Sequence, residues 1–311
     1  NSRVLIIDGL NLYLRTFAVN GMLNDRGVPI GGMMGFLKSL AYAIRETNPT
    51  RLIVTYDGAG GSQRRRKLHP NYKGNRKPGK RITRWDAFKN IEEEKQAMKI
   101  QFSRLLEYLD TLPINVISID KIEADDTIAY ITNNLLKDEV IIMSADQDFL
   151  QLVNERVTVW SPIKKIFYTP EKVLEDYGVP AHNFLMYKVL MGDKSDNLEG
   201  VKGLGPKKLP KILPDISSNP LDLDFILDYA SKGTEPMHKR IVESIDQLTL
   251  NEKLMDLKNP PISGELKLQI TRLIEAPINL LSSNNFNTMY TDDQMGNAID
   301  IPDIWLKQHF T

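Results

Sequence analysis

Three stretches of the sequence end an apolar run in a carboxylate. RVLIID ends at Asp8, RLIVTYD ends at Asp57, and VIIMSAD ends at Asp146, with Asp148 two residues later. A carboxylate is costly to hold beside an apolar core unless a cation or a hydrogen-bond donor pairs with it. A single aspartate in this place can simply cap the helix that follows. Its repetition after successive apolar runs instead indicates a shared site.

A fourth run, INVISID, ends at Asp120 and leads directly into the acidic stretch EADD. Apolar runs that alternate with helical patterns predict a parallel sheet, whose strands all end along one edge. Open α/β folds bind their ligands at that edge. Clustered carboxylates repel one another, and hard divalent cations such as Mg²⁺ or Mn²⁺ suit their oxygens. We therefore expect a metal site built from seven acids: Asp8, Asp57, Glu123, Asp125, Asp126, Asp146 and Asp148.

A second informative stretch is MGDKSDNLEGVKGLGPKK, which follows a helical pattern. Asp193 and Asp196 are three residues apart, so both face one way if the last helical turn persists. Glycines among lysines predict a turn whose backbone N–H groups approach a phosphate, although a lone glycine turn is more often structural. Pro206 suits the first position of the next helix. The candidate phosphate contacts in this turn are Lys202, Gly203, Gly205, Lys207 and Lys208.

The net charge of zero hides a segregation of charge. Residues 64–84 carry ten Lys and Arg and no acid, so the remaining chain holds 30 basic residues against 40 acidic ones. Such a block indicates a polyanionic partner, or else a solvated surface loop. Its first basic residues are candidate contacts for that partner: Arg64, Arg65, Arg66 and Lys67.

The composition, with 41% hydrophobic and 26% charged residues, is ordinary for a globular protein. The 311 residues allow one large domain or two modest ones. No apolar run reaches the roughly 18 residues of a membrane span, and the start of the chain lacks a signal-peptide pattern. The absence of cysteine excludes disulfides and thiolate metal sites, and it fits a reducing cytoplasm.

Strands that alternate with helices predict a doubly wound sheet with right-handed crossovers. Residues 86–110 form a long amphipathic helical pattern, and residues 157–162 are a candidate fifth strand. Beyond residue 215 the sequence is less informative. We expect helices over 223–257, a polar loop over 282–297 and a short terminal helix over 301–310.

Together these stretches resemble the 5′-nuclease family, which includes flap endonucleases, bacteriophage 5′-exonucleases and the N-terminal domain of bacterial DNA polymerase I. The matching stretches, spread over roughly residues 3–210, are VLIIDGLNLYLRTF, YDG, YKGNR, EADD, SADQDFLQL and MGDKSDNLEGVKGLG. The resemblance implies a PIN-like α/β core over residues 1–180, with a mostly parallel twisted sheet flanked by helices. It also implies a helical arch at about 62–105, and a helical duplex-binding region over 181–311 with a helix–three-turn–helix at about 184–213.

The resemblance also implies roles for individual residues. Asp193 and Asp196 would join the seven acids above in holding two or more Mg²⁺ or Mn²⁺ ions. Lys73 and Arg76 would contact the scissile phosphate. Tyr72 would stack on a base, and Lys188 would steady the substrate strand. The glycine turn would bind duplex DNA with a K⁺ ion; here the chain departs from the family, with PKKLP in place of Lys followed by Thr and Ala.

The activity implied is that of a structure-specific 5′→3′ exonuclease and 5′-flap endonuclease that leaves 5′-phosphate and 3′-hydroxyl ends. Its partners would be branched or nicked duplex DNA, RNA/DNA hybrids and a replication polymerase or clamp. Because no polymerase follows, we expect a free-standing monomer in a bacterial or phage-infected cytoplasm. Two alternatives stay open. A PIN-like single-strand ribonuclease is disfavoured by the glycine turn and basic segment, and a non-catalytic junction-binding protein by the complete set of acids.

Overall fold

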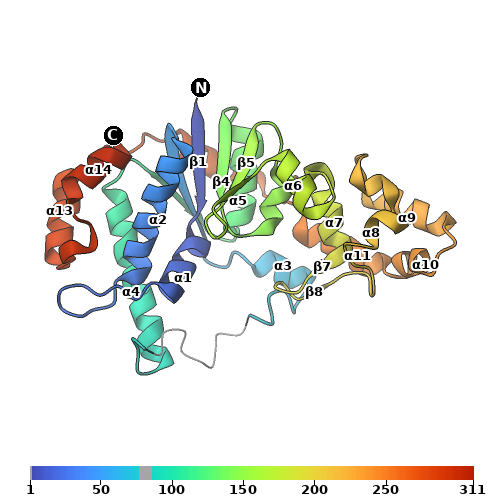
Figure 1. Cartoon of the computed structure of the whole chain (residues 1–311), viewed down its shortest axis with the longest axis horizontal. Helices are drawn as coiled ribbons and strands as arrows, with labels where there is room; N and C mark the ends of the chain where they lie inside the picture. Colours follow the sequence, from blue (N-terminus) through green and yellow to red (C-terminus); the bar gives the residue numbers. More distant parts are fainter. Residues whose placement is uncertain (1, 77–85) are drawn as a thin grey trace.

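A six-stranded sheet lies at the centre of the computed structural model, which describes residues 2–76 and 86–311 (Figure 1). The strand order is β3-β2-β1-β4-β5-β6; β1 to β5 are parallel, and β6 pairs antiparallel with β5. The predicted mostly parallel sheet and its fifth strand are confirmed, whereas β6 was not predicted. The strands are β1 (Arg3–Asp8), β2 (Arg51–Asp57), β3 (Asn115–Ile119), β4 (Glu139–Met143), β5 (Val157–Ser161) and β6 (Ile166–Tyr168).

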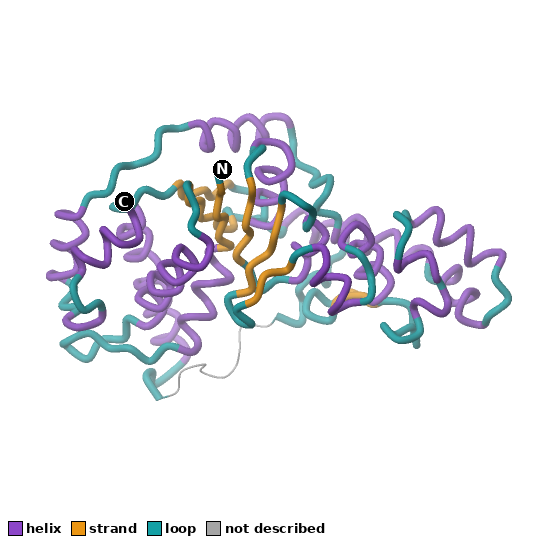
Figure 2. The backbone as a smooth tube through the Cα atoms, turned by 45° about the horizontal axis from the view of Figure 1, so that its top comes forward, coloured by secondary structure: helices purple, strands orange, loops and turns teal. Residues whose placement is uncertain are grey.

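Helices cover both faces of the sheet (Figure 2). Successive strand residues point to opposite faces, so Val4 and Ile6 of β1 join one apolar cluster while Leu5 and Ile7 join another. This burial on both sides explains why the strands read as continuous apolar runs. The first cluster includes α5 (Ala124–Tyr130), α6 (Pro170–Tyr177), α7 (Phe184–Met191), α11 (Ile245–Met255) and α12 (Gly264–Glu275). The second includes α1 (Gly9–Val19), α2 (Gly31–Thr47), α4 (Ile91–Asp110), α13 (Ser283–Asp292) and α14 (Pro302–Phe310).

The strand order creates a switch point between β1 and β4. From β1 the chain builds β2 and then β3 outward on one side, and it returns across the sheet to β4 on the other. Crossovers that leave neighbouring strands in opposite directions open a crevice at the carboxyl ends of those strands. Of the two strands that flank this crevice, β1 ends at Asp8, and β4 is followed by Asp146.

The region after α7 extends away from the sheet (Figure 1). It begins with the hairpin of β7 (Gly192–Asp193) and β8 (Leu198–Glu199) and continues with α8 (Leu209–Ile212), α9 (Leu223–Lys232) and α10 (Pro236–Glu243). The prediction that Pro206 opens the second helix is wrong, because α8 begins at Leu209 and Pro210 lies in its first turn. Proline is tolerated there because that turn needs no N–H from it.

The end of the chain returns to the sheet-containing part of the molecule, although residues 181–311 were expected to form one helical region. The predicted loop over 282–297 is wrong, since α13 buries Phe286 and Tyr290 on one side. Asp293 then pairs with Arg104 of α4, with Oδ2 at 2.8 Å from Nε. Three apolar residues, Phe286, Met289 and Tyr290, among Ser, Asn and Thr give too weak a periodicity to reveal such a helix. The terminal helix α14 is confirmed.

The basic segment is described only in part. Its first residues form α3 (Gln63–Leu68) and the turns that follow up to residue 76. Residues 77–84, and with them that portion of the predicted arch, lie outside the described residues. Among the helices of residues 2–76 and 86–311, none combines the length and apolar content needed to cross a bilayer.

Candidate metal centre

Four carboxylates, here called the edge cluster, gather at the carboxyl ends of the strands: Asp8, Asp57, Asp125 and Asp146. Burial, with the charge of Asp57 adding, raises the pKa of Asp8 to about 6. Burial and the charges of Asp146 and Asp8 raise the pKa of Asp125 well above its ordinary value. Within the described residues, no Lys or Arg forms an ion pair with any of these four side chains. A cation of another kind would relieve this repulsion.

Three of these four carboxylates also hold helix N-termini in place. Asp8 Oδ1 accepts a hydrogen bond from the backbone N of Asn11 at 3.4 Å, and Asp57 Oδ1 accepts one from Ala124 at 2.6 Å. Asp146 Oδ1 accepts one from the N of Asp148 at 2.9 Å. The prediction that such an aspartate caps the helix that follows is therefore correct for Asp8 and Asp146, whereas Asp57 meets the start of α5, 67 residues further along the chain. Capping does not exclude a cation, because a carboxylate has about four acceptor sites and each cap uses one.

Three further carboxylates, here called the hairpin cluster, are Asp148, Asp193 and Asp196. Each offers an oxygen, and these oxygens lie within 4.8 Å of one another. The expected helical turn does not bring them together, since α7 ends at Met191. The hairpin does so instead: Asp193 Oδ1 accepts from the N and Oγ of Ser195, both at 2.7 Å. Such a set of hard oxygen donors suits a divalent cation.

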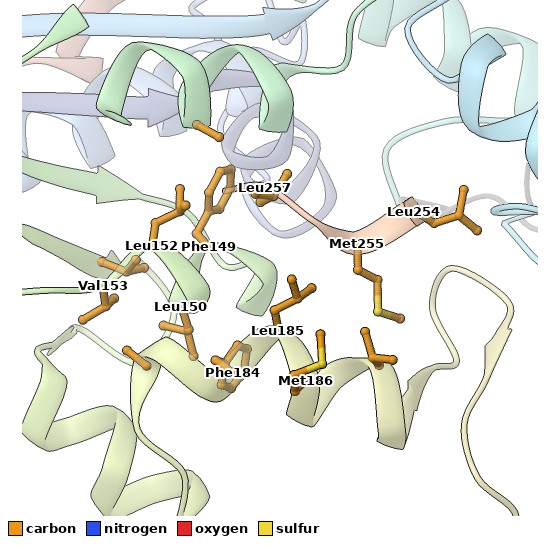
Figure 3. Packing of buried hydrophobic residues seen from close by; sticks show 14 of the residues in the cluster. Phe149, Leu150, Leu152, Val153, Phe184, Leu185, Met186, Leu254, Met255 and Leu257 are labelled. Carbon is orange, nitrogen blue, oxygen red and sulfur yellow. The ribbon is translucent and has the colours of Figure 1, made fainter. Parts of the chain in front are cut away.

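Apolar contacts fix where Asp148 lies relative to Asp193. Phe149 and Leu150, from the short 3₁₀ helix Gln147–Leu152, belong to the same buried cluster as Phe184 and Leu185 of α7 (Figure 3). Asn251 of α11 adds polar ties, because its Nδ2 donates to the carbonyls of Val189 at 3.0 Å and Glu199 at 2.8 Å. Side chains on such rigid supports keep their spacing.

The hairpin cluster contains its own cations. Lys188 Nζ lies 2.5 Å from Asp193 Oδ2 and 3.1 Å from Asp148 Oδ1, and Lys188 is 8% exposed. The structure thus makes Lys188 a buried counter-ion, where the sequence suggested a contact to the substrate strand. Arg76 Nη2 lies 2.6 Å from Asp196 Oδ1 and stays half exposed. Burial, with the charge of Asp146, still raises the pKa of Asp148 to about 7.

Lys73 and Tyr72 both reach Glu123 at the start of α5. Lys73 Nζ lies 3.0 Å from Glu123 Oε1, and the Tyr72 hydroxyl lies 3.4 Å from Oε2. Burial raises the pKa of Glu123, but Arg65 and Lys73 outweigh it and hold that pKa below its ordinary value. Tyr72 is 4% exposed and belongs to the apolar core. In this conformation its ring therefore offers no face for the predicted stacking on a base.

The four basic residues of α3 differ in exposure. Arg66 and Lys67 are exposed and Arg64 is half-buried, so these three remain candidates for a DNA contact. Arg65 is 4% exposed and forms ion pairs with Glu123 and Asp126. The prediction that Arg65 contacts the substrate is thus wrong, and the expected metal ligand Asp126 faces this arginine.

The glycine turn presents exposed lysines close to the hairpin: Lys202, Lys207 and Lys208. Gly203 has a φ of +81°, which favours glycine, and its carbonyl accepts from Lys208 Nζ at 3.1 Å. Gly205 has open space around it and no positive φ, so this position does not require glycine. A groove of about 710 Å³, lined in part by Asn75, Lys194 and Lys202, lies beside the turn.

Two serines that sequence reasoning missed orient the acids. Ser144 Oγ donates to Asp8 Oδ2 at 2.9 Å, and Ser62 Oγ donates to Glu123 Oε1 at 2.7 Å. Ser144 lies within the SADQD stretch, but its pairing with Asp8 depends on β1 and β4 being neighbours. The buried Nη1 of Arg15 in α1 has no hydrogen-bond partner among residues 2–76 and 86–311, and no pattern in the sequence indicated this.

Comparison with known proteins adds to this geometry. The family described as "5′-3′ exonuclease, N-terminal resolvase-like domain" matches residues 3–178. The chain is 30% identical over 280 residues to a 5′-3′ exonuclease of Bacillus subtilis, covering 86% of this chain and 87% of the relative. It is 34% identical over 219 residues to the thermostable DNA polymerase I of Thermus thermophilus. That match covers 70% of this chain but 24% of the polymerase.

Solved structures show the same fold at low sequence identity. A T5 5′-exonuclease with bound divalent metal ions (zinc) has a TM-score of 0.66 and 22% identity, covering 94% of this chain and 98% of that one. The catalytic core of Rad2 in complex with DNA substrate has a TM-score of 0.52 and 15% identity, covering 100% and 92%. These likenesses concern the fold.

Proposed function

Because the chain belongs to the 5′-3′ exonuclease family and is a nuclease, we propose that it is a structure-specific, divalent-metal-dependent 5′-nuclease. The observation that carries the proposal is the convergence of the edge cluster and the hairpin cluster beside the basic residues Lys73 and Arg76. The reaction is hydrolysis of a phosphodiester to 5′-phosphate and 3′-hydroxyl ends. The substrates of the protein are nucleic acids with free 5′ ends or 5′ flaps.

The donor set fits two Mg²⁺ or Mn²⁺ ions. The edge cluster supplies four carboxylates and the hairpin cluster supplies three, all with oxygen ligands that hard cations prefer. Asp148 Oδ1 has Lys188 Nζ at 3.1 Å, so an ion bound at this oxygen would share it with the lysine. The chemistry that two such ions supply when bound is activation of an attacking water and stabilisation of the leaving oxygen.

The chain's own residues bind and orient the phosphate. Lys73 and Arg76 follow α3 and reach the acids from the basic segment, so they can carry positive charge to a phosphate that approaches the centre. Their present pairs with Glu123 and Asp196 hold both side chains at the site before substrate binds. No side chain needs to act as a general base in this scheme.

Duplex binding is assigned to the glycine turn. Its exposed lysines and backbone N–H groups can contact phosphates, and such contacts position a duplex without reading its sequence. A K⁺ ion between the turn and a phosphate belongs to the same proposal. We further expect activity on RNA/DNA hybrids, action as a monomer in the cytoplasm, and a replication polymerase or clamp as partner.

Cleavage of an end-labelled 5′-flap duplex in Mg²⁺, compared with EDTA, tests the proposal. We expect cleavage near the junction that depends on the metal, and the downstream product should carry a 5′-phosphate that a phosphatase removes. A single-stranded RNA is the control for the alternative, a PIN-like ribonuclease. Cleavage of that RNA alone would favour the alternative, and binding of the flap without cleavage would favour a junction-binding protein.

A further inference from the structure

We propose that Arg65 is a positioning residue of the metal centre, and that Asp126 anchors this arginine instead of binding a metal ion. The inference rests on the proposed function, because it concerns the same site. It separates the adjacent residues Asp125 and Asp126 into a metal-facing group and an anchoring group.

Arg65 and Asp126 form a two-pronged ion pair. Arg65 Nη1 lies 2.7 Å from Asp126 Oδ2, and Nη2 lies 2.7 Å from Asp126 Oδ1. This arrangement uses both oxygens of the carboxylate and matches the planar fork of the guanidinium. Arg65 is 4% exposed and Asp126 is 5% exposed. A charge buried to this degree is stable only while its partner remains, so each residue depends on the other.

Asp125 faces a different environment although it is the next residue. Successive residues of a helix point about 100° apart, so neighbours do not share a face. The strongest charge interactions of Asp125 are with Asp146 and Asp8 of the edge cluster. In the first turn of α5, Asp126 therefore pairs with Arg65, and Asp125 belongs to the edge cluster.

Arg65 also determines where Glu123 lies. Its Nη1 lies 2.8 Å from Glu123 Oε2, while Oε1 of the same carboxylate accepts from Ser62 and Lys73. Glu123 is 1% exposed, so these contacts leave it little freedom. Because Lys73 reaches the site through Glu123, a displaced Glu123 would also displace the lysine proposed to meet the phosphate.

A third contact ties Arg65 to the helical region. Arg65 Nε donates to the carbonyl of Leu254 at 2.9 Å. The side chain of Leu254 belongs to the buried cluster shown in Figure 3, beside the end of α11. One guanidinium thus joins α3, α5 and α11. The arrangement is typical of groups behind a metal site that orient its ligands, whose loss commonly weakens metal binding about 10–100-fold.

The first experiment replaces the planar guanidinium of Arg65 with the ammonium group of a lysine. Arg65→Lys keeps the positive charge but cannot make the paired contacts, and Arg66→Lys makes the same change on the exposed side of the same helix. Calorimetric titration with Ca²⁺, thermal unfolding in EDTA, and kcat and KM on a 5′ flap in Mg²⁺ are measured. We expect Arg65→Lys to weaken Ca²⁺ binding about tenfold and to lower kcat more than it raises KM. Arg66→Lys should keep the wild-type melting temperature and Ca²⁺ affinity.

The second experiment compares the adjacent acids. In EDTA, Asp125→Asn should raise the melting temperature, because it relieves repulsion in the edge cluster, while Ca²⁺ binding is lost. Asp126→Asn should lower the melting temperature, because it removes the two-pronged partner of the buried Arg65 and leaves only the pair with Glu123 among the described residues. It should weaken Ca²⁺ binding no more than Arg65→Lys does. The double variant Arg65→Lys/Asp126→Asn should show less than the sum of the two single effects.

The outcomes separate the two proposals. If wild-type protein fails to cleave the flap, the proposed function is wrong. If wild-type protein cleaves but Asp126→Asn raises the melting temperature in EDTA and abolishes Ca²⁺ binding as Asp125→Asn does, Asp126 is a ligand and the inference is overturned. Ca²⁺ affinity and kcat unchanged in Arg65→Lys would overturn the positioning role. If Arg65→Lys does not fold, the Asp126→Asn comparison decides the assignment.

Discussion

The edge cluster and the hairpin cluster are built from the same residue type but are neutralised differently. Asp8, Asp57, Asp125 and Asp146 face one another, and within the described residues no Lys or Arg forms an ion pair with them. The hairpin cluster instead holds Lys188 and Arg76 in direct contact with its acids. In the first cluster the charge of Lys73 offsets part of the repulsion without an ion pair, and retained protons or a bound cation would relieve the rest. The second is already partly neutralised by its own side chains.

Because of this difference, substitutions in the two clusters should affect activity and stability in different ways. Replacing a carboxylate of the edge cluster with the neutral amide of Asn lowers a repulsion and keeps a hydrogen-bond acceptor, so it should cost activity but not stability. Removing a side chain from the hairpin cluster breaks an ion pair, so it should cost stability as well. Four predictions use that contrast, beginning with the largest expected effect.

Asp146→Asn should abolish flap cleavage, with a loss of at least about 10³-fold, because it removes a proposed metal-ligating carboxylate without changing the side-chain shape. In EDTA its melting temperature should equal or exceed that of the wild type, and flap binding should persist. The measurements are single-turnover cleavage in Mg²⁺ and thermal unfolding. Asp120→Asn is the matched control, because Asp120 also follows a strand but lies outside both clusters. Retained cleavage in Asp146→Asn would count against the site.

Lys73→Ala should lower kcat on a 5′ flap about 10²-fold and change the dissociation constant of the flap little, because the lysine is proposed to act on the phosphate at the metal centre. Cleavage is measured in Mg²⁺ and binding in Ca²⁺. Lys137→Ala, an exposed lysine before β4 at the opposite edge of the sheet, is the control. An unchanged kcat, or a loss of binding alone, would show that Lys73 only contacts the DNA and does not act on the phosphate at the metal centre.

Lys188→Met should lower the free energy of unfolding in EDTA by about 3 kcal/mol, because it leaves the partly buried carboxylates of Asp148 and Asp193 without their counter-ion. Mg²⁺ should restore part of the loss by supplying the missing positive charge. Urea unfolding with and without Mg²⁺ measures both effects. Stability equal to the wild type in EDTA would show that the pairs of Lys188 contribute nothing, and the contrast between the clusters would fail.

The metal-free protein should lose stability as the pH rises from about 4 to about 7. Burial first, then neighbouring charges, raise the pKa of Asp8 to about 6 and that of Asp148 to about 7, from 3.8. In this range the unfolded chain releases protons that the folded protein retains, so ionisation favours unfolding. The melting temperature in EDTA should be higher at pH 5 than at pH 8, and Mg²⁺ should stabilise more at pH 8. Equal stabilisation by Mg²⁺ at both pH values would argue against repulsion as the cause.

Some expectations from sequence failed for identifiable reasons. Arg65 lies in a run of four basic residues, and nothing in the run distinguishes the one that turns inward to meet Asp126. Tyr72 was expected to be accessible to a base but is buried beside Glu123. The convergence of Asp193 with Asp196 was predicted correctly, but from a helical turn where the chain forms a hairpin. In each case residues far away in the chain determine where the side chain points, and the local sequence does not show this.

The sequence by itself determined the sheet, the edge to which its acids belong and the family. Apolar runs must be buried on both faces, and parallel strands must end on one side, whatever the details of packing. Only the tertiary structure decided which acids meet one another and which meet Lys73, Arg65, Arg76 or Lys188. A charge's partner depends on distances between segments far apart in the chain, and those distances are fixed by the packed core.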